Sequence, residues 1–268
     1  MMSSPPVVLS IAGSDCSAGA GIQADLKSFH TLDTYGLTVV SGVVAETPNK
    51  VVSWEAMPAK LVREQLECLL ESYPVAAIKT GLLFSPEIVQ CVAQTLKGKE
   101  IPLIIDPVGS ASAGASFGGE TFLTSLSEQL FPLAALITPN LREAQALAGL
   151  DSDDQAELGS QLAHQFGVNV LVKGGHHDDP TRSIDLLTDP NGRSHEFCLP
   201  RLTGPDYHGT GCTLSASIAA YIARGTPLKD AIMQAKSFLH QAISAGHHWE
   251  SGPTGEHLDA LNLFNRNS

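Results

Sequence analysis

The chain has 268 residues, of which 43% are hydrophobic and 16% charged, and its formal net charge is −12. This composition excludes a disordered chain, and the length predicts one α/β domain over residues 1–268. The negative charge argues against binding to nucleic acid or to an anionic membrane, so a small-molecule partner is expected.

The cysteines are five in number and widely spaced, without a C-x-x-C pair. This pattern indicates reduced thiols rather than disulfides or a zinc site. The amino terminus has no basic segment leading into an apolar run, and no apolar stretch reaches the roughly 18 residues needed to span a bilayer. We therefore expect a cytoplasmic protein.

Short β-branched runs alternate with longer helical patterns, which is typical of a parallel sheet with connecting helices. Strands are expected at 7–12, 37–45, 76–79, 102–105, 135–138 and 168–172, and helices at 22–32, 61–71, 86–96, 120–130, 142–147 and 155–166. Residues 184–188 and 194–199 flank an Asn191-Gly192 turn and predict an antiparallel hairpin. Helices at 211–223 and 227–245 follow, and residues 251–268 are left unassigned. The predicted fold is α/β, with a mainly parallel central sheet, helices on both faces and a small antiparallel hairpin at the sheet edge.

Polar residues and glycines follow the predicted strands. In an open parallel sheet, ligands bind beyond the carboxyl ends of the strands. The residues expected to meet at that edge are Gly13 to Asp15, Glu46, Lys79 to Gly81, Asp106 and Asn140.

The segment His208-Gly209-Thr210-Gly211-Cys212 opens a predicted helix. Backbone N–H groups and the positive end of the helix dipole favour a phosphate or a developing anion there. The same field predicts a thiolate at Cys212. The alternative is a glycine-rich turn whose cysteine only packs in the core.

Three further positions suit a phosphate or metal site. Asn140 and Glu143 lie on one face of a predicted helix and could hold water around Mg²⁺, although a capping box explains them equally well. Asp106 ends a buried strand, where a carboxylate must be solvated, paired or bound to metal. Lys173 could neutralise phosphate charge, or could be a surface lysine in a turn.

The segment Gly19-Ala20-Gly21 to Ala24 also fits the G-x-G-x-x-A pattern of dinucleotide-binding folds, with Glu46 as the acidic ribose ligand. A nicotinamide-dependent enzyme is therefore an alternative. In that fold the first glycine directly follows the strand, whereas residues 14–18 intervene here. The pattern is accordingly weak support for a nicotinamide cofactor.

Taken together, these motifs resemble the hydroxymethylpyrimidine and phosphomethylpyrimidine kinases of thiamin synthesis, in the ribokinase superfamily. The segments that carry the resemblance are residues 12–15, 19–27, 78–83, 106–108, 138–144, 172–176 and 208–214. The resemblance covers nearly the whole chain.

The resemblance implies a ribokinase-like fold, a homodimer, and ATP with Mg²⁺ as cofactors. It implies phosphorylation of a hydroxymethyl group and then of the resulting monophosphate to a diphosphate. The implied substrate-binding residues are Gly13, Ala20, Val44, Glu46 and Leu82. The implied catalytic residues are Gly209, Thr210, Gly211 and the general base Cys212. The resemblance further implies that Asp106, Asn140 and Lys173 bind the nucleotide, and that Asp106 and Glu143 hold Mg²⁺ through water.

The chain departs from the family pattern at two places. Glu46 stands where a glutamine is usual, so either the bound ring is protonated, Glu46 itself is protonated, or the preferred substrate differs. Residues 109–114 replace a segment that usually carries a lysine. Pyridoxal or pyridoxine kinase is the closest alternative function, and a catalytically weak protein that senses the pyrimidine is an alternative of another class.

Overall fold

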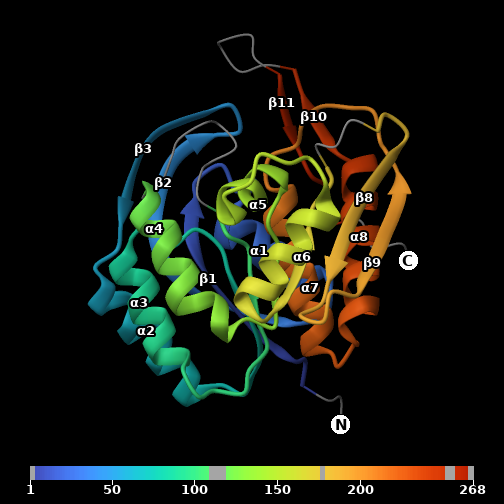
Figure 1. The fold of residues 1–268 in the computed structure, drawn as a ribbon. Helices are drawn as coiled ribbons and strands as arrows, with labels where there is room; N and C mark the ends of the chain where they lie inside the picture. Colours follow the sequence, from blue (N-terminus) through green and yellow to red (C-terminus); the bar gives the residue numbers. More distant parts are fainter. Residues whose placement is uncertain (1–3, 109–118, 176–178, 251–256, 265–268) are drawn as a thin grey trace.

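The structure is a computed structural model, and it describes residues 4–108, 119–175, 179–250 and 257–264. A nine-stranded sheet has the order β3-β2-β1-β4-β5-β6-β7-β8-β9 (Figure 1). The pairings from β2 through β1 and β4 to β7 are parallel, and β3, β8 and β9 run antiparallel to their neighbours. The predicted α/β class with a mainly parallel sheet is confirmed.

The strands alternate with helices along most of the chain. The strands are β1 (Val7–Asp15), β2 (Tyr35–Thr47), β3 (Lys50–Ala56), β4 (Val75–Thr80), β5 (Leu103–Ile105), β6 (Leu136–Ile137), β7 (Asn169–Val172), β8 (Arg182–Thr188) and β9 (Ser194–Pro200). The helices are α1 (Gly21–Thr31), α2 (Ala59–Ser72), α3 (Pro86–Leu96), α4 (Gly119–Ser125), α5 (Leu141–Ala148), α6 (Gln155–Phe166), α7 (Thr210–Ala223) and α8 (Leu228–Ser244). None of these described helices is both long enough and apolar enough to cross a membrane.

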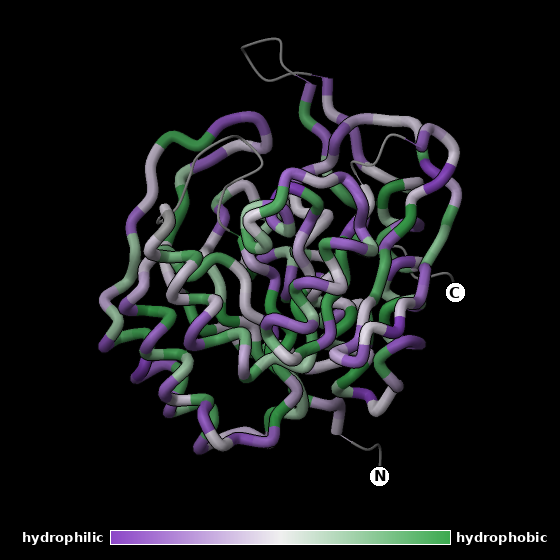
Figure 2. Tube along the Cα trace, in the orientation of Figure 1, coloured by the Kyte–Doolittle hydropathy of each residue, from purple (hydrophilic) through white to green (hydrophobic). Residues whose placement is uncertain are grey.

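Two apolar clusters lie on opposite faces of the sheet. On one face, residues of α2, α3, α5 and α6 form one cluster with Leu9 and Ile11 of β1. On the other face α1, α7 and α8 contribute Phe29 and Leu214, which pack in one cluster with Val8 of β1. Because successive side chains of a strand point to opposite faces, β1 supplies both clusters. Figure 2 shows hydrophobic and hydrophilic residues alternating along the outer helices, whose polar faces meet water.

The predicted hairpin is confirmed, since β8 and β9 pair antiparallel and Gly192 has a φ of 77° in the turn. Three features differ from the prediction. The edge strand β3 and the small pair β10 (His247–Trp249) and β11 (Leu258–Ala260) are additional. The helix expected over 120–130 is α-helical to Ser125 and continues as a π-helical turn at Leu126–Leu130.

Candidate functional site

The loop after β1 is built around the carboxylate of Asp15. Its oxygens accept backbone N–H bonds from Ser17 (2.7 Å), Gly19 (2.9 Å) and Ala20 (2.8 Å). Burial alone would raise the pKa of Asp15, but His208 and these N–H groups lower it well below its usual value. The N–H groups of the G-x-G-x-x-A segment are thus already bonded to a carboxylate, which argues against a dinucleotide pyrophosphate there.

Glycines allow this loop to touch the start of α7. Gly209 has a φ of 86°, and a Cβ there would lie 1.9 Å from the carbonyl oxygen of Gly19. Gly21 has a φ of 57°, and a Cβ there would lie 2.4 Å from the carbonyl oxygen of Gly13. Only glycine fits such positions without strain. The two glycine-rich motifs therefore hold the amino terminus of α7 against the end of β1.

Cys212 lies in the first turn of α7, where the sequence predicts a thiolate. That prediction is wrong: burial raises the pKa of the Cys212 thiol to about 11, and the nearby Lys79 cation offsets the shift only in part. A helix dipole contributes up to about 2 kcal/mol in favourable geometries. At Cys212, the loss of hydration is the larger effect.

Lys173, Asp106 and Glu143 form a cluster beyond the ends of β5, β6 and β7. The Lys173 Nζ atom lies 2.7 Å from Asp106 and 3.9 Å from Glu143. Burial alone would lower the pKa of Lys173, but the charges of Asp106 and Glu143 raise it. With a side chain only 13% exposed, Lys173 is not the surface lysine of the alternative interpretation. Asp106 is paired, as a carboxylate at the end of a buried strand requires.

Asn140 and Glu143 form the capping box that the sequence allowed. The Glu143 N–H donates to the Asn140 side chain at 2.9 Å, and the Asn140 N–H donates to the Glu143 carboxylate at 2.7 Å. Burial raises the pKa of Glu143 to about 7, while Lys173 opposes the shift. Asp106 and Glu143 place two carboxylates beside one lysine. This oxygen-rich donor set fits Mg²⁺ held through water.

The residues expected to bind the acceptor lie around the ends of β1, β2 and β4 and at the start of α1. They are Gly13, Ala20, Val44, Glu46 and Leu82. A Cβ at Gly13 would touch the Phe84 ring at 2.9 Å, and Val44 pairs with Asp15 and with Trp54 in the sheet. The expected roles of the five residues remain predictions.

Aromatic residues at this end were not predicted. The Phe84 and Trp54 rings have centroids 5.5 Å apart, and Phe84 has a φ of 64°, which is unusual for a side chain of this size. Trp54 lies on β3, the strand that the sequence analysis did not identify. Its sequence signal is only the group of β-branched and aromatic residues Val51, Val52 and Trp54, which marks no buried face.

Lys79 lies near the carboxyl end of β4, as expected. Its side chain is fully buried, however, and its Nζ atom lies 2.8 Å from each carboxylate oxygen of Asp25 on α1. The Ser10 hydroxyl donates to the same carboxylate. The clue in the sequence is Asp25, which falls on the apolar side of α1 with Ile22. A charge at such a position needs a buried partner.

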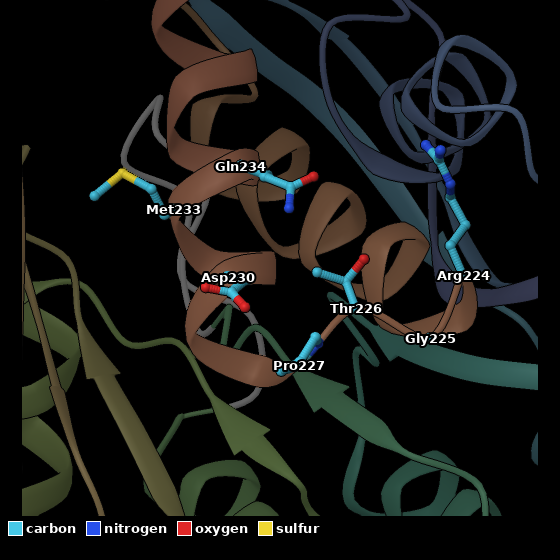
Figure 3. A pocket seen from close by; sticks show the side chains of 7 residues that line it. All are labelled: Arg224, Gly225, Thr226, Pro227, Asp230, Met233 and Gln234. Atoms are coloured by element: carbon cyan, nitrogen blue, oxygen red, sulfur yellow. The ribbon is translucent and has the colours of Figure 1, made fainter.

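Another expectation, for the glycine-rich segment 109–114, falls on residues outside the described part of the chain. The structure describes a separate surface depression of about 550 Å³ at the turn between α7 and α8, lined by Arg224, Asp230 and Gln234 among others (Figure 3). It lies at the far end of the 14-residue helix α7, about 20 Å from Cys212 at 1.5 Å per residue. The depression is therefore separate from the candidate site.

The uncapped helix terminus at Gly209 to Gly211 lies beside the Lys173–Asp106 pair. A Cβ at Gly211 would lie 3.2 Å from Lys173 Nζ and 3.4 Å from Asp106. Backbone N–H groups of a helix start and a lysine thus converge where a phosphoryl group would carry its charge. The ribokinase-like fold and this site define a small-molecule kinase.

The particular family follows from comparison with known proteins. The family model described as phosphomethylpyrimidine kinase matches residues 15–257, so the chain belongs to that family. The chain is 40% identical over 246 residues to the hydroxymethylpyrimidine/phosphomethylpyrimidine kinase of Streptomyces coelicolor, covering 90% of each chain. The family that the sequence resembles is confirmed.

Solved structures agree on the fold. An ADP complex of Bacillus subtilis pyridoxal kinase has a TM-score of 0.84 and 34% identity, covering 96% of this chain and 98% of that one. A phosphomethylpyrimidine kinase from Clostridium difficile has a TM-score of 0.77 and 34% identity, covering 89% and 99%. The ADP in the first of these complexes agrees with a nucleotide-using fold.

Proposed function

We propose that this protein phosphorylates hydroxymethylpyrimidine with ATP and then converts the monophosphate to the diphosphate. The observation that carries the proposal is the convergence of the α7 terminus with Lys173 and Asp106 in a chain of this family. Phosphoryl transfer depends mostly on positioning and on neutralising charge. This arrangement can do both.

Each part of the site has a separate task in this scheme. The N–H groups of Gly209, Thr210 and Gly211 bind the transferred phosphoryl group, and Lys173 offsets its negative charge. Asp106 and Glu143 would hold Mg²⁺ through water, and Asn140 positions Glu143 through the capping box. When bound, Mg²⁺ supplies further positive charge to the phosphate oxygens.

Cys212 takes the proton of the acceptor hydroxyl in the first phosphorylation. Because burial raises the pKa of the Cys212 thiol to about 11, the thiolate is the minor form at neutral pH, and it is a correspondingly strong base. The acceptor of the second phosphorylation is already a phosphate anion. It has no hydroxyl proton that must be removed, so the second step needs little help from Cys212.

The test is a product assay with hydroxymethylpyrimidine, its monophosphate and MgATP, resolving mono- from diphosphate. Cys212→Ala is expected to slow the first phosphorylation by about 10²-fold or more, the range of general base catalysis, and to spare the second. Cys198→Ala, at a half-buried thiol on β9, is the matched control. Equal losses in both steps would reject the base role, and no diphosphate from wild type would reject the proposed function.

Pyridoxal or pyridoxine kinase is the second candidate. The TM-score of 0.84 to a pyridoxal kinase supports this second candidate function. The pyrimidine and pyridoxine substrates are also alike, because each is an aromatic ring that carries a hydroxymethyl arm. A panel of pyrimidine and pyridine alcohols with MgATP separates the two by relative kcat/KM. Failure to consume ATP with any of them would favour the sensor alternative.

We further expect a homodimer in the cytoplasm. Support for the dimer comes from the edge strand β3, where Val52 and Trp54 are 69% and 42% exposed, because such an edge favours pairing. Support for the compartment comes from the five free cysteines, which suit a reducing environment. Light scattering on wild type and Val52→Lys tests the dimer.

A further inference from the structure

The backbone that follows β7 is held by side chains from distant parts of the chain. Gly174 comes directly after Lys173, and its N–H donates to the Asp185 carboxylate on β8 at 2.9 Å. The Arg201 guanidinium donates to the Gly174 carbonyl at 3.3 Å and to the Gly175 carbonyl at 2.6 Å. Both polar groups of the Gly174 backbone are therefore bonded to side chains.

Gly174 also lies so close to β8 that there is no room for a side chain. A Cβ there would lie 1.8 Å from the carbonyl oxygen of Ile184 and 2.9 Å from Gln155 Nε2. The Gln155 amide donates to the carbonyls of Val172 and Ile184, at 3.0 and 3.1 Å, and so bridges β7 and β8 where their pairing ends. The segment from Val172 to Gly174 is thus fixed by close packing as well as by hydrogen bonds.

Asp185 is a buried carboxylate that is paired with a lysine of α8. Its second oxygen lies 2.7 Å from Lys236 Nζ, and both side chains are only 6% exposed. The Ser183 hydroxyl accepts a further bond from Lys236 at 3.3 Å. A buried ion pair is often no more stabilising than apolar residues of the same shape, so stability gives little reason for charges here. An apolar pair, however, would leave the Gly174 N–H without an acceptor.

The position of Gly174 matters because Lys173 reaches the candidate site from the same stretch of backbone. The Lys173 N–H donates to the Pro139 carbonyl at 2.9 Å, and its Nζ atom lies 2.7 Å from Asp106. A Cβ at Gly211 would lie only 3.2 Å from that Nζ atom. Because the N–H groups of Lys173 and Gly174 bond to different parts of the protein, losing either bond would let the backbone shift and carry the lysine away from the start of α7.

We propose that Asp185 is a positioning residue for phosphoryl transfer, which holds the Gly174 N–H so that Lys173 stays directed at the phosphoryl group. Lys236 compensates the charge of Asp185 and keeps its carboxylate in place. In this scheme Asp185 acts only through Lys173 and makes no contact with the reacting atoms. The inference rests on the proposed function, which gives Lys173 its task.

The test compares two double variants that both remove the buried charges. The first, Asp185→Asn with Lys236→Met, keeps an acceptor for the Gly174 N–H, whereas the second, Asp185→Leu with Lys236→Met, does not. The second is expected to lower kcat about 10²-fold, the scale of a displacement of about 1 Å, and to leave the KM of the acceptor within about twofold. The first is expected to keep kcat within about threefold of wild type. Equal losses of kcat in the two double variants would overturn the proposal.

The control for these kinetics is Ser183→Ala, which removes a bond to Lys236 but leaves Asp185 in place; its kcat should match that of wild type. Hydrogen exchange at the Gly174 N–H supplies a readout that needs no substrate. Exchange should be faster in the second double variant than in the first or in wild type, because only the second lacks the acceptor. Equal protection in all three proteins would overturn the proposal.

A cycle with Lys173 separates positioning from a purely structural role. The Asp185→Leu and Lys236→Met changes are repeated in a Lys173→Ala background. If Asp185 acts through Lys173, these changes should cost less than about threefold in kcat there, because the lysine that they misplace is already absent. The full loss of about 10²-fold in both backgrounds would show an independent effect and would overturn the proposal.

The cycle can be measured with any acceptor that wild type phosphorylates. Turnover of pyridoxine but not of hydroxymethylpyrimidine would therefore refute the proposed function alone. Formation of the diphosphate together with additive losses in the cycle would refute this inference alone. Absence of turnover with every acceptor in the panel would refute both.

Discussion

The buried pair Lys79–Asp25 can be tested by a double-mutant cycle on stability. Both side chains are fully buried, and the Lys79 Nζ atom bonds both Asp25 oxygens at 2.8 Å. Burial alone would lower the pKa of Lys79, but Asp25 outweighs it and raises the pKa, so the lysine is a cation in the folded state. Removing one partner leaves the other charge buried without compensation.

The expected magnitudes follow from that geometry. Lys79→Met or Asp25→Leu alone should cost about 3–5 kcal/mol, a large part of the roughly 5–15 kcal/mol that stabilises a typical domain. The double variant replaces the pair by apolar groups and leaves only the Ser10 hydroxyl without its acceptor, which costs about 1–3 kcal/mol. The coupling energy should thus be at least about 3 kcal/mol.

Urea unfolding of the four proteins, followed by circular dichroism, measures the cycle. The double variant should be at least as stable as either single variant. Additive costs, with a coupling below about 0.5 kcal/mol, would show that the two groups do not act as a charged pair. Single costs below about 1 kcal/mol would show that water reaches them.

Two further predictions concern the site. Gly209→Ala should lower the free energy of unfolding by more than about 2 kcal/mol, since its φ is 86° and its Cβ would meet Gly19 at 1.9 Å. Gly225 is the control, since its φ is 83° and no atom lies near its Cβ position, so Gly225→Ala should cost only about 1–2 kcal/mol in the same urea assay. Equal costs for the two variants would contradict the close approach of Gly209 to Gly19. The pKa of Glu143 is raised from 4.5 to about 7, so wild type should lose stability as pH rises through that window. Glu143→Gln should not lose stability in this way, so its free energy of unfolding should rise relative to that of wild type by about 3 kcal/mol between pH 4.5 and pH 7. A difference between the two proteins that stays constant with pH would refute the raised pKa of Glu143.

Periodicity was enough to predict the parallel core of this protein. The strands from β1 to β7 alternate with amphipathic helices, and polar residues at their ends locate Asp106, Asn140 and Lys173 at one edge. The edge strand β3 was not predicted, because its side chains are mostly exposed and its apolar residues do not mark a buried face. A short strand of this kind is recognised by its pairing with β2, which sequence pattern alone does not show.

Charge states were harder to predict than positions. A cysteine at a helix start suggests a thiolate, yet burial raises the pKa of the Cys212 thiol to about 11. Lys79 was expected at the edge where ligands bind, and it is also paired in the interior with Asp25 of α1. Both outcomes depend on burial by residues distant in sequence. Local motifs therefore identify the chemistry, while tertiary packing sets the protonation.

The electrostatic pattern around Cys212 explains how an anionic group can be accommodated. Lys79 is neutralised by Asp25, and Lys173 is paired with Asp106. The neighbouring helix α5 is capped by its own side chains, whereas α7 has no side-chain cap and no acidic residue in its first turn. Orphan N–H groups at a helix start need an acceptor. Because Gly209 at the N-cap makes no side-chain cap among the described residues, the N–H groups at the start of α7 add to the charge of Lys173 as a place for an incoming phosphoryl group.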